Sequence, residues 1–153
     1  VFADVDDNGD IIIHNNTVVS DGVTLTAGDD IVIGGTANKG NSNFSGYEAK
    51  SLTGLGDLTL KSAQGTAASG NIKTAGTIET LKGGNLTMTA GKDGSWDQDN
   101  IWVKGTVDVD GMLTAKAGDD VEFPCSTPGR WHQFCRIARR SKIMVILAGP
   151  IKG

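Results

Sequence analysis

This sequence contains few aromatic residues, and its first 123 residues lack three residue types altogether. The chain has 153 residues, only 5% of them aromatic, and residues 1–123 contain no Arg, Pro or Cys. With so few aromatics, Val, Ile, Leu and Ala must build the core. The absence of Pro from this part is compatible with continuous β-ladders, in which Pro would remove a hydrogen-bond donor. No run of 18 apolar residues occurs, which excludes a transmembrane helix.

The distribution of charge divides the chain near residue 123. Residues 1–123 carry 8 Lys against all 18 acids, a net charge of −10, whereas residues 124–153 carry four Arg and two Lys with no acid, a net charge of +6. Such a break indicates a repeat body followed by a basic tail with different properties. The tail has three alternative interpretations: a cap docked on the body, a disordered segment, or a segment foreign to the fold. The overall acidity does not favour a nucleic-acid partner.

What the body does contain is Gly, Thr and aliphatic residues in a recurring pattern. Residues 22–30, 56–62, 84–91 and 111–120 each alternate apolar and polar residues next to Gly. Alternation of this kind predicts short β-strands bounded by turns. Leu58, Leu86 and Leu113 recur with a period of about 28 residues, which lies in the range of repeat architectures. Ile72 and Ile101 have nearly the same spacing, and nearer the N-terminus, between Ile11 and Ile31, the spacing is shorter.

This recurrence predicts a parallel β-helix of about five coils, with three strands to a coil. Inward aliphatic side chains would stack into columns, and outward Thr, Lys and Asp would face water. The turns need residues that accept positive φ or cap the backbone, which is the role of Gly, Asn and Asp. The alternatives are a β-sandwich or a Greek-key barrel, but neither requires the same Leu-Thr strand to return at a fixed interval.

The Leu-Thr strings that end in Ala-Gly, at residues 86–91 and 113–118, resemble the repeats of filamentous-haemagglutinin-like exoproteins of two-partner-secretion type. The resemblance covers roughly residues 10–123. It implies a right-handed parallel β-helix shaft, secretion to the bacterial cell surface and a role in adhesion, and it supplies no catalytic residues. The family's secretion domain carries Asn-Pro motifs, and this chain contains none. The chain therefore resembles shaft and not secretion domain.

One local pattern predicts a calcium loop. Asp4, Asp6 and Asn8 would provide side-chain oxygens, Asp10 a backbone carbonyl, and Gly9 the bend. The Glu that completes such a loop is replaced by Asn15. The alternative is an acidic solenoid turn. The pairs at residues 29–30 and 119–120 also follow Ala-Gly. Residues 28–35 faintly resemble the calcium-binding nonapeptide of RTX proteins, but the tandem copies that complete such a site are absent. We therefore interpret both pairs as turn Asp residues that cap their own backbone.

Two tryptophans give the sequence its second candidate site. Trp96 and Trp102 flank the acid-rich segment 91–100 and would form a sugar-contacting patch. This supports an alternative function, a carbohydrate-binding or polysaccharide-cleaving module on a β-helix. The body has His14 as its only His and no Arg, which argues against cleavage. The competing interpretation is that the tryptophans cover the end of a strand stack.

The tail contains Cys125 and Cys135, which flank His132 and match no common zinc spacing. They predict either a small disulfide loop in an exported protein or two free thiols. The sequence as a whole predicts a non-enzymatic, extracellular structural or adhesive segment, with calcium as the one candidate cofactor. Its expected partners are other copies of itself, end to end, and a host or cell-surface glycan or protein.

Overall fold

A computed structural model describes residues 2–3, 9–35, 46–65, 70–91, 99–118, 120–122, 136–139 and 144–147. Their strands form three β-sheets, which we call sheets A, B and C. Sheet A contains β1 (Phe2–Ala3), β4 (Val23–Ala27), β7 (Leu58–Ser62), β10 (Leu86–Ala90), β13 (Met112–Ala117) and β16 (Met144–Leu147). Sheet B contains β2 (Ile11–Ile13), β5 (Ile31–Ile33), β8 (Ile72–Thr74), β11 (Ile101–Val103), β14 (Asp120–Glu122) and β15 (Arg136–Arg139). Sheet C contains β3 (Thr17–Val19), β6 (Ser51–Gly54), β9 (Thr77–Thr80) and β12 (Thr106–Val109).

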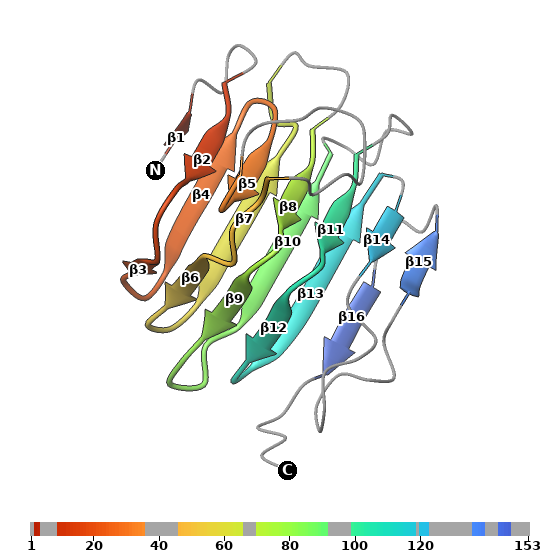
Figure 1. Ribbon diagram of the computed structural model, residues 1–153. Helices are drawn as coiled ribbons and strands as arrows, with labels where there is room; N and C mark the ends of the chain where they lie inside the picture. Colours follow the sequence, from red (N-terminus) through yellow and green to blue (C-terminus); the bar gives the residue numbers. More distant parts are fainter. Residues whose placement is uncertain are drawn as a thin grey trace.

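From β2 to β14, every third strand belongs to the same sheet (Figure 1). Strands β2, β3 and β4 form coil 1, and three further coils end at β7, β10 and β13 before β14 begins the next. All pairing between successive coils is parallel. The chain is therefore a parallel β-helix, which confirms the predicted fold. The described residues contain no helix that is long and apolar enough to cross a membrane.

Inward side chains stack into aliphatic columns with one residue from each coil. In sheet A, the register joins Leu58 to Leu86 and Leu86 to Leu113, and all three are at most 1% exposed. Burial of each such side chain contributes about 1.5–3 kcal/mol. This register confirms the predicted recurrence of the leucines, and the shorter step from Ile11 to Ile31 is confirmed in the same way. The matching column of sheet B contains Ile11, Ile31, Ile72, Ile101 and Val121, and that of sheet C contains Leu52, Ile78 and Val107.

Outward side chains of sheet A form a second kind of column. Its strands alternate buried and partly exposed residues, as expected for a sheet with one face on the core. The Thr of each Leu-Thr pair occupies the outward position next to the buried Leu. Thr59, Thr87 and Thr114 are in register with one another, and the column continues in the first coil with Thr24, which follows the half-buried Val23.

The coils differ in length because loops of different length join the strands. Ile31 and Ile72 are in register although they are far apart in the chain, since a long segment lies between β5 and β6. The sequence pattern does not predict β6, because Leu52 is its only aliphatic residue. Its neighbours nevertheless place it, as Leu52 pairs with Thr17 of the preceding coil and Ile78 of the following one.

Sheet B departs from simple alternation because its outer face is also covered. Every residue of β5, β8 and β11 is buried, including the outward Val32, Lys73 and Trp102. Part of the cover comes from Tyr47, whose ring packs so closely on Gly35 that a Cβ there would meet it at 2.5 Å. Because this outer face is buried, the ammonium group of Lys73 lies against the aromatic rings of Tyr47 and Trp102 and not in water.

At the C-terminal end of the stack, the pairing changes direction. Strand β16 pairs antiparallel with β13, and β15 pairs antiparallel with β14, with an irregularity between Val121 and Glu122. These two strands lie along the last edges of sheets A and B (Figure 1). The backbone of β16 therefore adopts the folded-back arrangement that a terminal cap requires. The break in composition at residue 123 predicts that the body folds without residues 124–153, and this stays a prediction.

Candidate functional site

A ladder of Asp and Asn side chains runs along the corner where each coil enters sheet B. Asp10, Asp30, Asn71 and Asn100 each stand immediately before a sheet B strand. The Asp30 N–H donates to Asp10 Oδ1 at 3.0 Å, and the Asn71 N–H donates to Asp30 Oδ1 at 2.7 Å. The Asn100 N–H in turn donates to Asn71 Oδ1 at 3.1 Å. Each of these acceptors thus binds the backbone of the next coil.

The ladder provides hydrogen-bond acceptors for backbone N–H groups at a corner of the solenoid. At a corner the strands turn, and backbone N–H groups there need acceptors outside the sheets. A buried N–H without an acceptor costs about 1–3 kcal/mol, and Asn71 and Asn100 are at most 3% exposed. The Asn amides add side-chain bonds of their own, from Asn71 Nδ2 to Asp30 Oδ1 and from Asn100 Nδ2 to Asn71 Oδ1.

A second, more exposed ladder lies before the strands of sheet A. Asp21 Oδ1 accepts a hydrogen bond from the Asp57 N–H, Asp57 Oδ1 accepts one from the Asn85 N–H, and Asn85 Oδ1 accepts one from the Met112 N–H, each at 2.8 Å.

The first ladder corrects one expectation from the sequence. Asp30 was expected to cap its own backbone, and this expectation is wrong. Its Oδ1 bonds to the next coil, because stacked coils bring that N–H within reach of the carboxylate.

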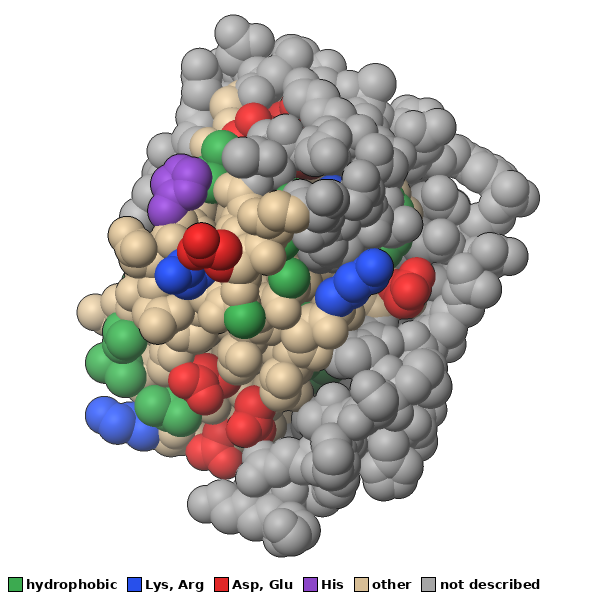
Figure 2. Space-filling view, viewed as in Figure 1, with side chains coloured by type: hydrophobic (Ala, Val, Ile, Leu, Met, Phe, Trp, Pro, Cys, Tyr) green, Lys and Arg blue, Asp and Glu red, His purple; other side chains and the backbone are tan. Residues whose placement is uncertain are grey.

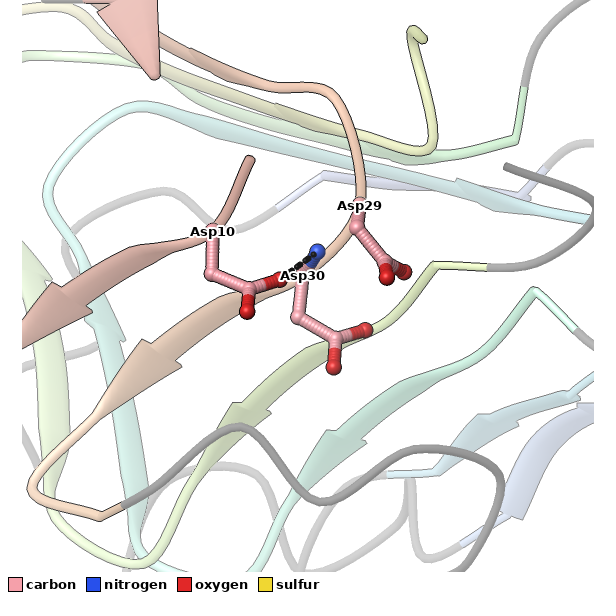
Figure 3. Close-up of side chains that lie close together, drawn as sticks. All are labelled: Asp10, Asp29 and Asp30. Carbon is pink, nitrogen blue, oxygen red and sulfur yellow. Dashed lines mark hydrogen bonds between the residues drawn. The ribbon is translucent and has the colours of Figure 1, made fainter. Parts of the chain in front are cut away.

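Three carboxyl groups converge where the first ladder begins. Asp10, Asp29 and Asp30 each place a carboxylate oxygen within 4.8 Å of the other two. Figure 3 shows them on two adjacent turns of the solenoid, with the Asp10–Asp30 hydrogen bond as a dashed line. Asp29 and Asp30 are 1% and 0% exposed and Asp10 is half-buried, so two of the three acids are buried. Asp30 Oδ2 accepts no hydrogen bond within the described part of the chain.

The environment disfavours a charge on Asp30. Burial raises the pKa of Asp30 from its ordinary 3.8 to about 6, and the neighbouring carboxylates of Asp29 and Asp10 also raise it. Hydrogen bonds from Asn71 act in the opposite direction. Binding of a proton or of a cation to these carboxylates is therefore favoured, because either one reduces the negative charge in the cluster.

A buried lysine lies near the same cluster. Lys73 is 0% exposed, and its Nζ lies 5.2 Å from the centre of the Tyr47 ring and 5.6 Å from that of Trp102. Both distances are in the range of cation–π attraction. Burial lowers the pKa of Lys73, while the negative charge of Asp30 raises it. The charge of Asp30 also adds to the effect of burial in raising the pKa of Tyr47.

The site residues predicted from the sequence lie in different parts of the chain. Asp10 belongs to the cluster of three acids, whereas its predicted partners Asp4, Asp6 and Asn8 lie outside the described residues. Trp102 is 8% exposed and packs beside Lys73, so the sugar-contacting role predicted for it would need more of its ring to be accessible. The other predicted residues outside the described part are Trp96, Asp119, Cys125, His132 and Cys135.

Spacing in the sequence connects Asp10 and Asp30, although they were interpreted separately there. Ile11 and Ile31 are predicted to stack, and Asp10 and Asp30 are the residues immediately before them. The same step from Ile72 and Ile101 leads to Asn71 and Asn100. An Asp or Asn before each of these strands is the signal from which the ladder could have been predicted.

Among the described residues on the face in Figure 2, hydrophobic side chains form small separate groups, and several acidic side chains gather on the lower part of the face. A hollow of about 300 Å³ lies against His14, Gly34, Gly35, Gly46 and Glu48. Its carboxylate, Glu48, is paired with Lys50 at 3.0 Å.

No family model, curated protein or solved structure matches the chain. The class of protein, a parallel β-helix, is therefore assigned from the fold itself.

Proposed function

We propose that this chain is a structural segment, the stiff shaft of a secreted or surface-displayed bacterial β-helical protein of the filamentous-haemagglutinin type. The observation that carries the proposal is the in-register stacking of parallel coils along one axis. Strands β1 and β2 lie at one end of the stack and β14 to β16 at the other (Figure 1). A segment built in this way acts as a spacer between whatever is attached at its two ends.

The stiffness of such a shaft comes from the three sheets and the ladders together. Each coil is bonded to the next through all three sheets, and the Asp and Asn side chains add bonds at two corners. At the usual strand spacing of about 4.8 Å, roughly five coils span about 24 Å. The chain alone thus makes a short rod, and length would come from further coils or from association of copies.

End-to-end association is the second part of the proposal. In the described residues, β3 and β12 form the two outer edges of sheet C and have no strand beyond them. An open strand edge presents backbone groups that pair readily with another strand. Val18, in the middle of β3, is 63% exposed and places an apolar side chain at this edge.

A non-enzymatic role fits how the charged side chains are placed. The buried charged residues Asp29, Asp30, Lys73 and Asp99 pack against the coils, and Asp99 Oδ1 accepts a hydrogen bond from the Gly70 N–H. The Glu48 carboxylate at the surface hollow is paired with Lys50. Resemblance to secreted adhesins supports an extracellular location and a glycan or protein on another cell as the partner. Display is tested by protease treatment of intact producing cells, in which a surface protein is degraded and an internal one is spared.

Sedimentation velocity over a range of concentrations, with electron microscopy of the same samples, tests the shaft. We expect species that grow along one axis, and we expect Val18→Lys to shorten them because a charge at an edge strand opposes pairing. Thr87→Lys, on the outward face of the central strand β10, is the matched control and should leave association unchanged. A chain that remains monomeric at every concentration would argue against end-to-end assembly.

A further inference from the structure

We propose that Asp10, Asp29 and Asp30 form a binding site for a divalent cation of the calcium type, which links coil 1 to coil 2. The site is distinct from the linear loop of residues 4–10 predicted from the sequence, with which it shares only Asp10. It does not depend on the proposed shaft function, because it concerns the first two coils of the isolated chain.

The geometry of the three carboxyl groups suits one ion. Calcium binds oxygen ligands at about 2.3–2.6 Å, so two oxygens on the same ion lie at most about 5 Å apart. The oxygens of Asp10, Asp29 and Asp30 lie within 4.8 Å of one another. Three carboxylates are also the hard oxygen donors that calcium prefers. Water and backbone carbonyls would supply its remaining ligands.

A second observation points to a ligand at this place. Asp30 is completely buried, and its Oδ2 accepts no hydrogen bond from the described residues, while Oδ1 is bonded to Asn71. A buried carboxylate oxygen without a donor is costly, and a bound cation removes that cost. Asp30 stands in the ladder between Asp10 of coil 1 and Asn71 of coil 3. A cation bound to Asp30 Oδ2 and to Asp10 would therefore connect coils 1 and 2.

Within the part of the chain that the structure describes, positive charge only partly balances the cluster. Lys73 is the basic residue whose pKa responds to Asp30, and its Nζ lies against the rings of Tyr47 and Trp102. Of the three carboxyl groups, only that of Asp30 has a resolved effect on this ammonium group. A divalent cation would bring the local charge close to neutral without a change in the fold.

The link between coils depends on where the three residues stand. Asp10 immediately precedes β2 of coil 1, and residues 29–30 immediately precede β5 of coil 2. The ion would therefore hold together two turns that are now joined there by backbone bonds and by the Asp30 N–H bond to Asp10 Oδ1.

The test is calcium titration by calorimetry together with thermal melting of the intact chain in chelator and in about 10 mM calcium. If the dissociation constant is about 0.1–1 mM, as in extracellular calcium modules, the melting temperature should rise by about 3–10 °C. Asp29→Asn and Asp30→Asn should abolish both the heat of binding and the rise. Asn at position 30 retains an oxygen acceptor for Asn71, so this second variant should fold even if Asp29→Asn does not.

Asp57→Asn is the matched control, because Asp57 is an exposed ladder residue and the variant loses the same unit of charge. It should retain the full response to calcium. The proposal is overturned if the wild-type chain shows no response, or if the folded Asp30→Asn variant keeps it. It is equally overturned if Asp6→Ala abolishes the response while Asp29→Asn and Asp30→Asn retain it, which would assign calcium to the linear loop.

Discussion

Asn71 Oδ1 accepts two hydrogen bonds from Asn100, one from its backbone N–H and one from its side-chain Nδ2, both at 3.1 Å. The two residues stand at the same corner of successive coils. Asn71 also donates from Nδ2 to Asp30 Oδ1 at 3.3 Å. A single buried amide thus joins three coils.

The first prediction concerns this amide. Asn71→Ala should lower the free energy of unfolding by about 1–3 kcal/mol, because it leaves the buried Asn100 N–H without its acceptor. Asn85→Ala removes the equivalent acceptor for the Met112 N–H in the exposed ladder, where water can replace it. Its cost should be smaller. Urea unfolding of both variants measures the difference, and equal costs would show that burial of the ladder adds nothing.

A second prediction concerns the pKa of Asp30 in metal-free protein. Because its pKa is raised from 3.8 to about 6, the folded state binds a proton more tightly than the unfolded state. Stability from this residue is therefore fully present below about pH 4, declines as pH rises toward 6, and is then lost. A rise of this size in the pKa changes the free energy of unfolding by at most about 3 kcal/mol between pH 4 and pH 7.

Asp30→Asn isolates that contribution from those of the other acids. In chelator, the Asp30→Asn variant should be more stable than wild type at pH 7, because wild-type Asp30 is charged there and Asn is neutral. At pH 4 the two should be nearly equal in stability, because Asp30 of the folded wild type is then protonated and also neutral. A constant difference between wild type and Asp30→Asn across this range would contradict the raised pKa.

The third prediction tests the aliphatic column. Leu86→Ala should destabilise the chain by about 2–5 kcal/mol, because it opens a cavity between Leu58 and Leu113 that the parallel stack cannot close. Thr87→Ala changes the adjacent outward residue and should cost less than about 1 kcal/mol. Thermal or chemical unfolding measures both. Similar costs for the two variants would mean that the inward and outward faces are misassigned.

The sequence predicted the columns because a solenoid repeats its coil at regular places in the chain. Leu58, Leu86 and Leu113 could be aligned by counting, and their register is the one observed. The strand containing Leu52 escaped prediction because a long insertion separates it from β5 and a single aliphatic residue marks it. The same counting would have placed Asp10 next to Asp30 in the stack, because each residue immediately precedes one of the stacked isoleucines, but the two were interpreted separately from the sequence.

The features that the sequence could not predict depend on contacts made across the outer face of sheet B. A Trp beside an acid-rich segment is equally typical of a sugar platform and of a buried cover. The structure places Trp102 against Lys73, and Tyr47 reaches the same ammonium group from another loop. Neither the burial of Lys73 nor the raised pKa of Asp30 can be derived from residue spacing, since both depend on what covers the face.

The last prediction concerns the basic tail. The composition break at residue 123 predicts that the body folds without residues 124–153, and the buried core residues of the described part of the chain lie between Leu25 and Val121. A chain that ends at Phe123 should therefore keep its β-rich circular dichroism and a melting temperature within a few degrees of the full chain.

The pairing of β16 with β13 and of β15 with β14 adds a second expectation for the same truncation. Without the tail, the last edges of sheets A and B lose their antiparallel cover, and open edges pair with other chains. The truncated body should therefore sediment as larger species than the full chain at equal concentration. If it loses its β-rich spectrum, the tail is required for folding, and if it associates no more than the full chain, the antiparallel strands do not protect the end of the stack.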